Sequence, residues 1–252
     1  MSVLRYLNRQ NLAILRKGFF HPGFCPVCEK PTFFFRPFPY SYLMREYYRC
    51  VWCRATPRYR AFNLVLQDRF PDWRNLVIHE SSPGGAMSEK LANLCPAYIA
   101  SDYHSDQPLG APCGRTRNED LQHMTFPDAS FDLVVTMDVF EHLPFPEQAF
   151  REIARTLKPG GAHIFTVPCD FSADTLIRAS VTPTGELIHH LPAVYHGNPI
   201  DQKGSLVFRD WGRDLPSVIR STSGMETEIV RLCDFWRGIE PVFNEIYISR
   251  KV

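Results

Sequence analysis

Apolar residues along this chain gather into short runs that are separated by polar, acidic or glycine-containing turns. Residues 131–137 (FDLVVTM) form a continuous apolar run rich in β-branched residues, which is typical of a strand covered on both faces. Residues 162–167 (AHIFTV) form a second such run. Between them, apolar positions recur at helical spacing after Pro146, which can occupy the first turn of a helix. The pattern predicts a strand, a helix ended by residues 159–161 (PGG), and a second strand.

The same pattern recurs upstream. It predicts strands over 75–79 and 98–101, with a turn (79–88) and a helix (88–94) between them. Alternating strands and helices indicate right-handed crossovers and a parallel sheet. Ligands of such sheets bind beyond the carboxyl ends of the strands.

Polar residues stand at these predicted strand ends. Asp138, Glu141 and His142 follow the strand at 131–137, and Asp102 follows the strand at 98–101. An acid about 20 residues after a strand-ending turn is the arrangement that holds a ribose in dinucleotide-binding sheets. The turn itself departs from the usual glycine pattern, because residues 81–83 (SSP) stand where glycines are expected. The pattern therefore predicts a nucleotide-type site at this edge of the sheet.

Joined together, residues 75–168 resemble the class I S-adenosylmethionine-dependent methyltransferase family, most closely over 118–168, and more loosely as far as Val252. The resemblance implies an α/β, Rossmann-like methyltransferase fold with a seven-stranded, mostly parallel sheet. Residues 228–232 and 245–249 would form the closing pair with its antiparallel strand.

The resemblance also implies cofactor contacts. Asp102 would hold the ribose, Asp120 would accept from the adenine amino group, and the Leu121 backbone N–H would face the ring. The turn after the first strand would lie under the methionine moiety. The full set of expected cofactor-binding residues is Glu80, Ser81, Gly84, Gly85, Asp102, Asp120, Leu121 and Asp138.

Four cysteines near the start form two C-x-x-C pairs, separated by residues 29–49. Two such pairs supply the four thiolates of a tetrahedral metal site, and the spacing resembles a zinc ribbon. Iron in a rubredoxin-like site and a pair of disulfides are the alternatives. A closed four-thiolate site has no open position for water, so we expect structural zinc. The expected ligands are Cys25, Cys28, Cys50 and Cys53.

Residues 1–74 carry a net charge of +9, from 13 Lys or Arg against 4 Asp or Glu, in a chain whose overall charge is +1. Aromatic residues are interleaved with these arginines. A basic, aromatic zinc ribbon is able to bind RNA by phosphate contacts and base stacking. The alternatives are that the aromatic residues form the ribbon's core while the arginines pair with acids of the same chain, or that the arginines face an anionic small substrate.

Residues 169–226 separate the last parallel strand from the closing pair. Long ordered insertions in compact domains are usually functional, so we expect a lid over the methyl acceptor. His196, Tyr195 and His142 are the candidates for a general base or for orienting the acceptor.

The expected domains are an amphipathic helix over 1–20, a four-cysteine zinc ribbon over 21–60 and the methyltransferase domain over 61–252. No apolar run reaches the length of a membrane span, and the N-terminus lacks a signal-peptide core, so we expect a cytoplasmic protein that does not act at a membrane. The oligomeric state is left open.

Methyl transfer from S-adenosylmethionine to a small-molecule acceptor, such as a sugar or natural-product intermediate, is the expected function. An RNA base methyltransferase is the alternative enzyme. The incomplete glycine turn motivates a third hypothesis, a methyltransferase-fold protein that serves in binding or interaction only.

Overall fold

The computed structural model describes residues 18–37, 43–197, 203–240 and 244–251. The chain folds into two compact units, each assembled from separate segments. Unit 1 comprises residues 1–73, 84–94 and 230–246, and unit 2 comprises 74–83, 95–229 and 247–252, in both cases as far as they are described.

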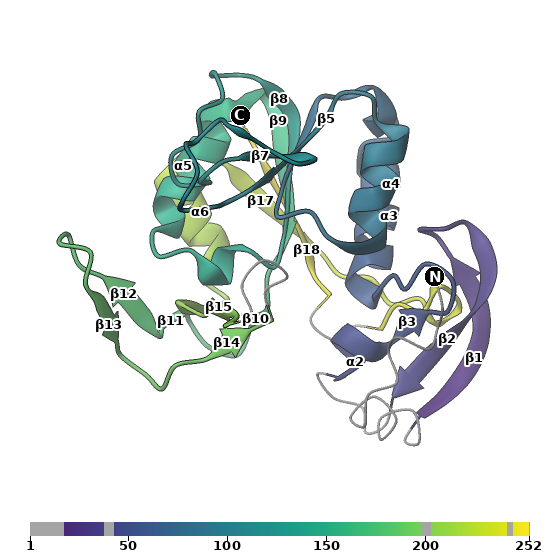
Figure 1. Ribbon diagram of the computed structural model, residues 1–252. Helices are drawn as coiled ribbons and strands as arrows, with labels where there is room; N and C mark the ends of the chain where they lie inside the picture. The colour runs from purple at the N-terminus through teal and green to yellow at the C-terminus, as the bar shows by residue number, and fades with distance from the viewer. Residues whose placement is uncertain (1–17, 38–42, 198–202, 241–243, 252) are drawn as a thin grey trace. The chain divides into compact units, whose positions relative to one another are not determined.

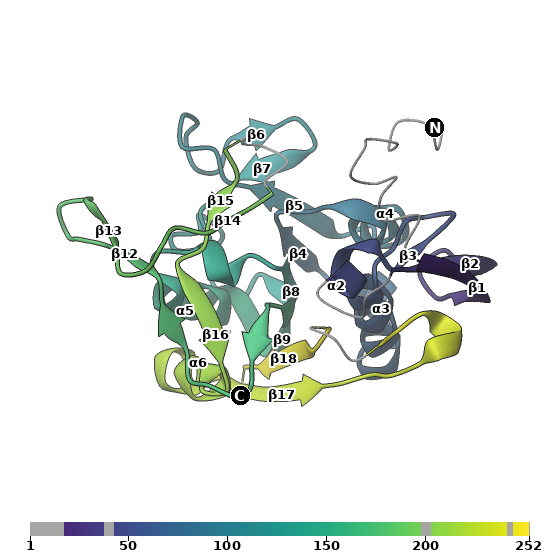
Figure 2. The same ribbon diagram turned by 90° about the horizontal axis from the view of Figure 1, so that it is seen from below.

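Unit 2 is organised around an eight-stranded sheet, one strand more than expected (Figure 2). In spatial order the strands are β17 (Glu226–Val230), β18 (Ile246–Arg250), β9 (Leu157–Thr166), β8 (Phe131–Met137), β4 (Ile78–Ser81), β5 (Tyr98–Asp102), β7 (Thr116–Asn118) and β6 (Pro112–Cys113). β9, β8, β4, β5 and β7 run parallel, and β18 runs antiparallel to β9. The expected mostly parallel, Rossmann-like sheet is therefore confirmed. The extra strand, β6, is the outer half of a short hairpin with β7.

Helices α5 (Pro146–Thr156) and α6 (Leu215–Ser223) lie side by side in unit 2 (Figure 1). The buried positions of α5 are Pro146, Ala149, Phe150, Ile153 and Thr156. Their spacing of three or four residues gives the helix one apolar face. That face joins the core that also contains Phe131, Val134 and Phe165 from the strands.

The end of α5 differs from expectation. The helix stops at Thr156, and residues 157–161 continue directly as the start of β9. The pairing of β8 with β9 shifts in register between Phe131 and Leu133, and this shift accommodates residues 158–161 of β9. The Lys158 ammonium donates to both carboxylate oxygens of Asp132 at 2.9 Å, which draws the segment onto β8. The PGG sequence is thus a bend within a strand rather than a helix stop.

As far as it is described, the insertion at 169–226 carries several short strands ahead of helix α6. β14 (Tyr195–His196) pairs with β15 (Ser205–Leu206), and β12 (Ala179–Val181) pairs with β13 (Leu187–His189). β16 (Arg209–Gly212) pairs with β10 (Cys169–Asp170) and with β11 (Leu176–Ile177). The β12–β13 hairpin extends away from the body of unit 2 (Figure 1).

Unit 1 contains a three-stranded antiparallel sheet of β1 (Gly18–Cys25), β2 (Lys30–Pro37) and β3 (Arg49–Cys50). Its helices are α2 (Leu43–Tyr47), α3 (Pro57–Arg69) and α4 (Gly85–Leu94). The helix expected over 1–20 falls mostly on residues 1–17, which lie outside the described residues. Residues 18–20 belong to β1 rather than to a helix. Within the part of the chain that the structure describes, no helix is long and apolar enough to cross a membrane.

Candidate active site

Three acids stand at neighbouring strand ends in the sheet of unit 2. Glu80 lies in β4, Asp102 ends β5, and Asp138 directly follows β8. The strands are in register, because Ser81 of β4 pairs with Ser101 of β5 on one side and with Thr136 of β8 on the other. The predicted ligand edge is therefore formed by the carboxyl ends of adjacent parallel strands.

Glu80 is buried, and its carboxylate accepts a hydrogen bond from the Tyr98 hydroxyl at 2.6 Å. Burial, together with the negative charge of Glu80, raises the pKa of the Tyr98 hydroxyl, so this proton stays in place. Ser81 is buried as well, and the next residue, Ser82, adopts a positive φ of 56°. The backbone N–H of Ser82 donates to the Ser101 carbonyl at 2.7 Å, which fixes the start of the turn.

The two glycines that remain in the turn belong to unit 1, at the start of α4. Gly85 has a φ of +72°, and a Cβ there would lie 2.8 Å from the Tyr59 ring, so both conformation and space require glycine. A Cβ at Gly84 would meet no atom within 4 Å. The Gly84 N–H donates to the Ser88 hydroxyl at 2.8 Å. The glycine at 85 is thus explained by local structure, and its role toward a cofactor stays a prediction.

Asp102 is half-buried. Burial raises the pKa of its carboxyl, and a hydrogen bond involving Thr116 opposes that rise. Asp102 pairs with Asn118 across β5 and β7, and the Glu119 N–H donates to the Asp102 carbonyl at 3.0 Å. These contacts hold the start of the loop that carries Asp120 beside the end of β5.

Asp120 and Leu121 open the loop that follows β7. One carboxylate oxygen of Asp120 accepts from the backbone N–H of Gln122 at 2.9 Å and from the Gln122 side-chain amide at 3.0 Å. The Leu121 side chain is buried in the apolar core of unit 2. The Leu121 side chain therefore anchors the loop, and the role of its backbone N–H toward the adenine ring stays a prediction.

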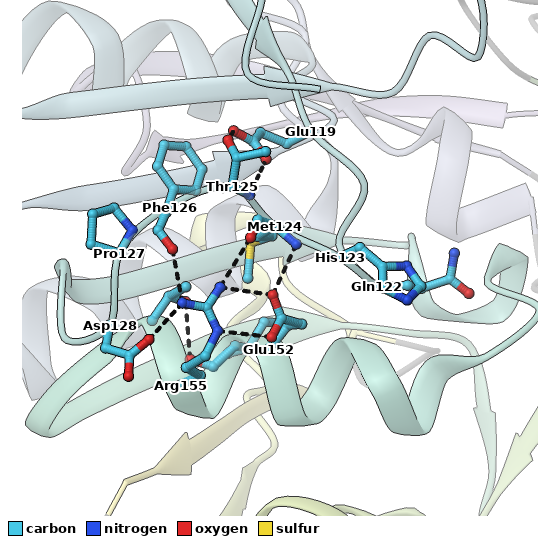
Figure 3. A network of polar contacts seen from close by, with 12 residues as sticks. Glu119, Gln122, His123, Met124, Thr125, Phe126, Pro127, Asp128, Glu152 and Arg155 are labelled. Atoms are coloured by element: carbon cyan, nitrogen blue, oxygen red, sulfur yellow. Dashed lines mark hydrogen bonds and ion pairs between the residues drawn. The ribbon is translucent and has the colours of Figure 1, made fainter. Parts of the chain in front are cut away.

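Arg155 of α5 fixes the same loop from below (Figure 3). Its guanidinium donates to the Met124 carbonyl at 3.0 Å and to the Phe126 carbonyl at 2.8 Å. It also binds Glu152 through two hydrogen bonds of 2.8 Å, and Glu152 accepts from the Met124 N–H at 2.9 Å. The pKa of the Glu152 carboxyl is lowered, mainly by Arg155. Sequence reasoning missed this clamp, and the only available signal was the i, i+3 spacing of the pair on the helix.

Glu119 secures the upper side of the loop (Figure 3). Its buried carboxylate accepts from the Thr125 N–H at 2.8 Å, from the Thr125 hydroxyl at 2.6 Å and from the Arg117 guanidinium at 2.6 Å. Residues 119–125 are thus closed into a compact loop whose first residues lie at the ligand edge.

Asp138 adopts a left-handed backbone conformation with a φ of 57°. Its N–H donates to the Thr166 carbonyl at 2.9 Å, and its carboxylate accepts from the Thr166 hydroxyl at 2.8 Å. A non-glycine residue in this conformation is uncommon, and such residues cluster at functional sites.

The predicted catalytic histidines come together although they are far apart in the sequence. The rings of His142 and His196 lie 5.0 Å apart, edge to face. The His142 Nδ1 atom lies 2.8 Å from the Leu206 carbonyl, and the Phe208 N–H donates to the Glu141 carbonyl at 2.8 Å. The insertion is therefore attached to the segment that follows β8. Tyr195 precedes His196 on β14, and its side chain is exposed.

The four cysteines of unit 1 also converge. The Sγ atoms of Cys25 and Cys53 lie 3.6 Å apart, and those of Cys28 and Cys50 lie 3.9 Å apart. Four thiolates at about 2.3 Å from one zinc ion form a tetrahedron with edges of about 3.8 Å. A disulfide bond is about 2.05 Å long, so the separations of 3.6 and 3.9 Å favour a shared metal over a pair of disulfides.

The arginines of the ribbon region have partners in unit 1. Arg36 pairs with Glu240 at 2.7 Å, and Arg58 pairs with Glu46 at 2.5 Å. Arg60 is fully buried and donates to the carbonyls of Ala55, Tyr48 and Gly238. Phe34 and Tyr48 are buried beside it, whereas Trp52 is exposed.

Residues 82–165 match the family model described as a methyltransferase domain. The match covers the turn after β4, two of the three acids at the strand ends (Asp102 and Asp138) and most of β9. Together with the strand order, it identifies the Rossmann-like methyltransferase fold.

A curated relative, the sarcosine/dimethylglycine N-methyltransferase of Halorhodospira halochloris, is 37% identical over 69 residues. That segment is 27% of this chain and only 24% of the relative, so the match spans about a quarter of that protein.

Two solved structures are also similar. An S-adenosylmethionine-dependent methyltransferase from Mesorhizobium loti is 17% identical, with a TM-score of 0.47 over 76% of this chain and 98% of the other. The 1,6-didemethyltoxoflavin-N1-methyltransferase of Burkholderia thailandensis is 14% identical, with a TM-score of 0.46 over 77% and 78% of the two chains.

Proposed function

We propose that this protein transfers the methyl group of S-adenosylmethionine to a small-molecule acceptor. The observation that carries the proposal is the methyltransferase-domain match over residues 82–165, a range that includes the acids Asp102 and Asp138 at the carboxyl ends of β5 and β8. The name of the curated relative, which describes methylation of a small amine, supports a small acceptor.

Asp102 would bind the ribose hydroxyls, because a half-buried carboxylate at a strand end can accept two hydrogen bonds from a diol. Asp120 would accept from the adenine amino group, with the Leu121 N–H facing the ring. Each of these roles is part of the proposal. The set of cofactor-binding residues would be completed by Glu80, Ser81, Gly84, Gly85 and Asp138.

S-adenosylmethionine supplies an activated methyl group, so the chain has to align the acceptor with the methyl carbon and exclude water. The insertion over 169–226 is suited to this task, because it is hydrogen-bonded to the segment after β8 through Leu206 and Phe208. We expect His142, Tyr195 and His196 to face the acceptor.

Zinc in the four-cysteine site would be structural. Four thiolates close the coordination shell, and the observed Sγ separations of 3.6 and 3.9 Å match the tetrahedron that zinc requires. We propose that the ion holds the two cysteine-bearing turns of unit 1 together.

The RNA alternative has weaker support. Arg36, Arg58 and Arg60 have partners within the chain, which leaves less positive charge for phosphate contacts. We therefore favour a small-molecule acceptor.

Calorimetric titration of the purified protein with S-adenosylmethionine and with S-adenosylhomocysteine tests the proposal. We expect saturable binding of both with one site per chain. An absence of binding at millimolar concentrations would refute the enzyme hypothesis and favour the interaction role. Salt-dependent binding of RNA would support the RNA alternative instead.

A further inference from the structure

Three metal-ligating side chains of unit 2 converge beside the end of β8. Glu141 and His142 come from the short 3-10 helix over Phe140–His142, and His196 comes from β14 of the insertion. One ligand atom from each residue lies within 4.8 Å of the others. The Glu141 Oε1 atom lies 3.8 Å from the His142 Nε2 atom and 3.9 Å from the His196 Nδ1 atom.

The orientation of His142 is fixed by the insertion. Its Nδ1 atom faces the Leu206 carbonyl at 2.8 Å, and a carbonyl can only accept, so Nδ1 carries the proton. In the neutral ring, Nε2 then presents a lone pair toward the Glu141 carboxylate. A histidine that binds a metal through one nitrogen usually donates its other N–H to a carbonyl or carboxylate. His142 has this arrangement.

The His142 Nε2 atom and the Glu141 Oε1 atom face each other at 3.8 Å, and both are electron-pair donors. A cation between them would attract the lone pairs of both groups.

We propose that Glu141, His142 and His196 bind a divalent cation. Ligand atoms 2.0–2.2 Å from one ion lie about 3–3.5 Å from one another. The His196 side chain is 44% exposed, and a slight rotation of it shortens the 3.9 Å separation from Glu141. The 3.8 Å between Glu141 and His142 shortens only when one of these two side chains rotates on binding the ion. The Glu141 side chain is only 2% exposed, and a cation bound to its carboxylate would stabilise the ionised form there.

The donor set indicates which ions fit. Two imidazoles and one carboxylate suit Zn²⁺, Co²⁺ or Fe²⁺ better than Ca²⁺ or Mg²⁺. Three protein ligands also leave coordination positions open, unlike the closed thiolate site of unit 1. Asp138 lies close enough to act on the charge of His142 and adds negative potential beside the site.

The site has a role that rests on the proposed function. An acceptor hydroxyl bound at an open position would have a lowered pKa, as metal-bound water does. Its proton would pass to water, and the oxygen electron pair would form the O–CH3 bond. The S–CH3 bond would break with its electrons staying on sulfur, which yields S-adenosylhomocysteine. We therefore infer a hydroxyl acceptor.

Calorimetric titration with Zn²⁺ tests the cation site. The protein is first loaded with one zinc per chain, so that the thiolate site is filled before the titration begins. We expect one further saturable site per chain. Wild-type protein that binds no second ion at millimolar Zn²⁺ would overturn the proposal.

Variants locate the second ion. His196→Ala and Glu141→Gln should each weaken its binding at least tenfold, because each removes one ligand or its charge. His189→Ala is the matched control, since His189 is another exposed histidine of the insertion, outside the three-residue cluster. Equal affinity in wild type and in both cluster variants would show that the second ion binds elsewhere and would overturn the proposal.

Open coordination is tested with Co²⁺ in place of the second zinc and with acetohydroxamate, an oxygen-donor chelator, as the probe. We expect the probe to shift the visible absorption of Co²⁺. An unchanged spectrum would mean a closed site and would overturn the acceptor role. None of these titrations contains S-adenosylmethionine, so failure of the cation site and failure of cofactor binding are distinguishable.

Discussion

Single carboxylates at the ligand edge owe their properties to the strands that hold them. Asp102 is half-buried at the end of β5, where burial raises the pKa of its carboxyl. Glu80, one residue before the end of β4, is buried and is bound to the Tyr98 hydroxyl. The sequence alone treats both as acids near a strand end, whereas the structure gives Asp102 the greater access to a ligand.

Asp102→Asn should weaken binding of S-adenosylhomocysteine about ten- to a hundredfold. The reason is that a hydrogen bond to a charged group contributes about 1.5–3 kcal/mol, and an amide replaces only part of it. Calorimetric titration measures the change. Asp106→Asn, at an exposed aspartate of the following loop, should bind as wild type does. Unchanged affinity in Asp102→Asn would remove this residue from the cofactor site.

At the scale of elements, helix α5 determines the shape of the loop over 119–128. Arg155 bonds two loop carbonyls and Glu152, while Glu119 bonds the loop from its other side. The loop has no regular structure of its own, so these side chains define its path.

Arg155→Ala should lower the affinity for S-adenosylhomocysteine and reduce the free energy of unfolding by about 1–3 kcal/mol, because two loop carbonyls lose their donor. Arg151→Ala provides the control, since Arg151 is an exposed arginine of the same helix. Calorimetry and thermal unfolding measure the two effects. If Arg155→Ala changed stability but left the affinity intact, the clamp would be purely structural.

Two buried histidines make the central strands sensitive to acid. His79 of β4 and His163 of β9 bond the hydroxyls of Ser101 and Thr136 at 2.8 and 2.9 Å. Burial lowers the pKa of each to about 3. The unfolded chain, with a histidine pKa near 6.5, therefore binds more protons than the folded chain between about pH 6.5 and 3. Stability should fall as the pH falls through this range.

His163→Gln should make the dependence of unfolding free energy on pH shallower below pH 6.5, by up to about 1.4 kcal/mol per pH unit. Denaturant unfolding at several pH values measures the slope. His123→Gln is the matched control, at a histidine whose side chain is exposed. A slope identical to wild type in His163→Gln would contradict the assignment of a neutral, buried imidazole.

At the scale of the whole molecule, residues far apart in sequence complete unit 1. Residues 230–240 join the ribbon, where Phe235 stacks on His21 at 4.1 Å and Glu240 pairs with Arg36. Some of the arginines that the sequence suggests as RNA contacts are therefore already paired with residues of the same chain.

Cys25→Ser should lose the bound metal and unfold unit 1, because structural zinc contributes about 10–16 kcal/mol to folding in comparable modules. Elemental analysis and thermal unfolding provide the measurements. Cys233→Ser should retain metal and stability, since Cys233 is exposed and outside the cluster. Full metal content in Cys25→Ser would refute the four-cysteine site.

Elements with a local signal are predictable from the sequence alone. Continuous apolar runs predicted β8 and the core of β9, Pro146 marked the start of α5, and cysteine spacing predicted the four converging thiolates. These predictions succeed because strand burial, helix spacing and turn chemistry act over a few residues.

Contacts between side chains that are far apart in the sequence form only when the chain is folded. His196 joins Glu141 and His142 because β14 and β15 return to the end of β8, and the Arg155 clamp forms because α5 packs beneath the loop after β7. The strand nature of residues 157–161 depends on tertiary contacts, because Leu157 pairs with β8 while Gly160 and Gly161 exchange backbone hydrogen bonds with Lys251, and helix-stop rules do not contain such contacts. Contacts of this kind join residues that are tens of positions apart in the sequence, so no local sequence pattern predicts them.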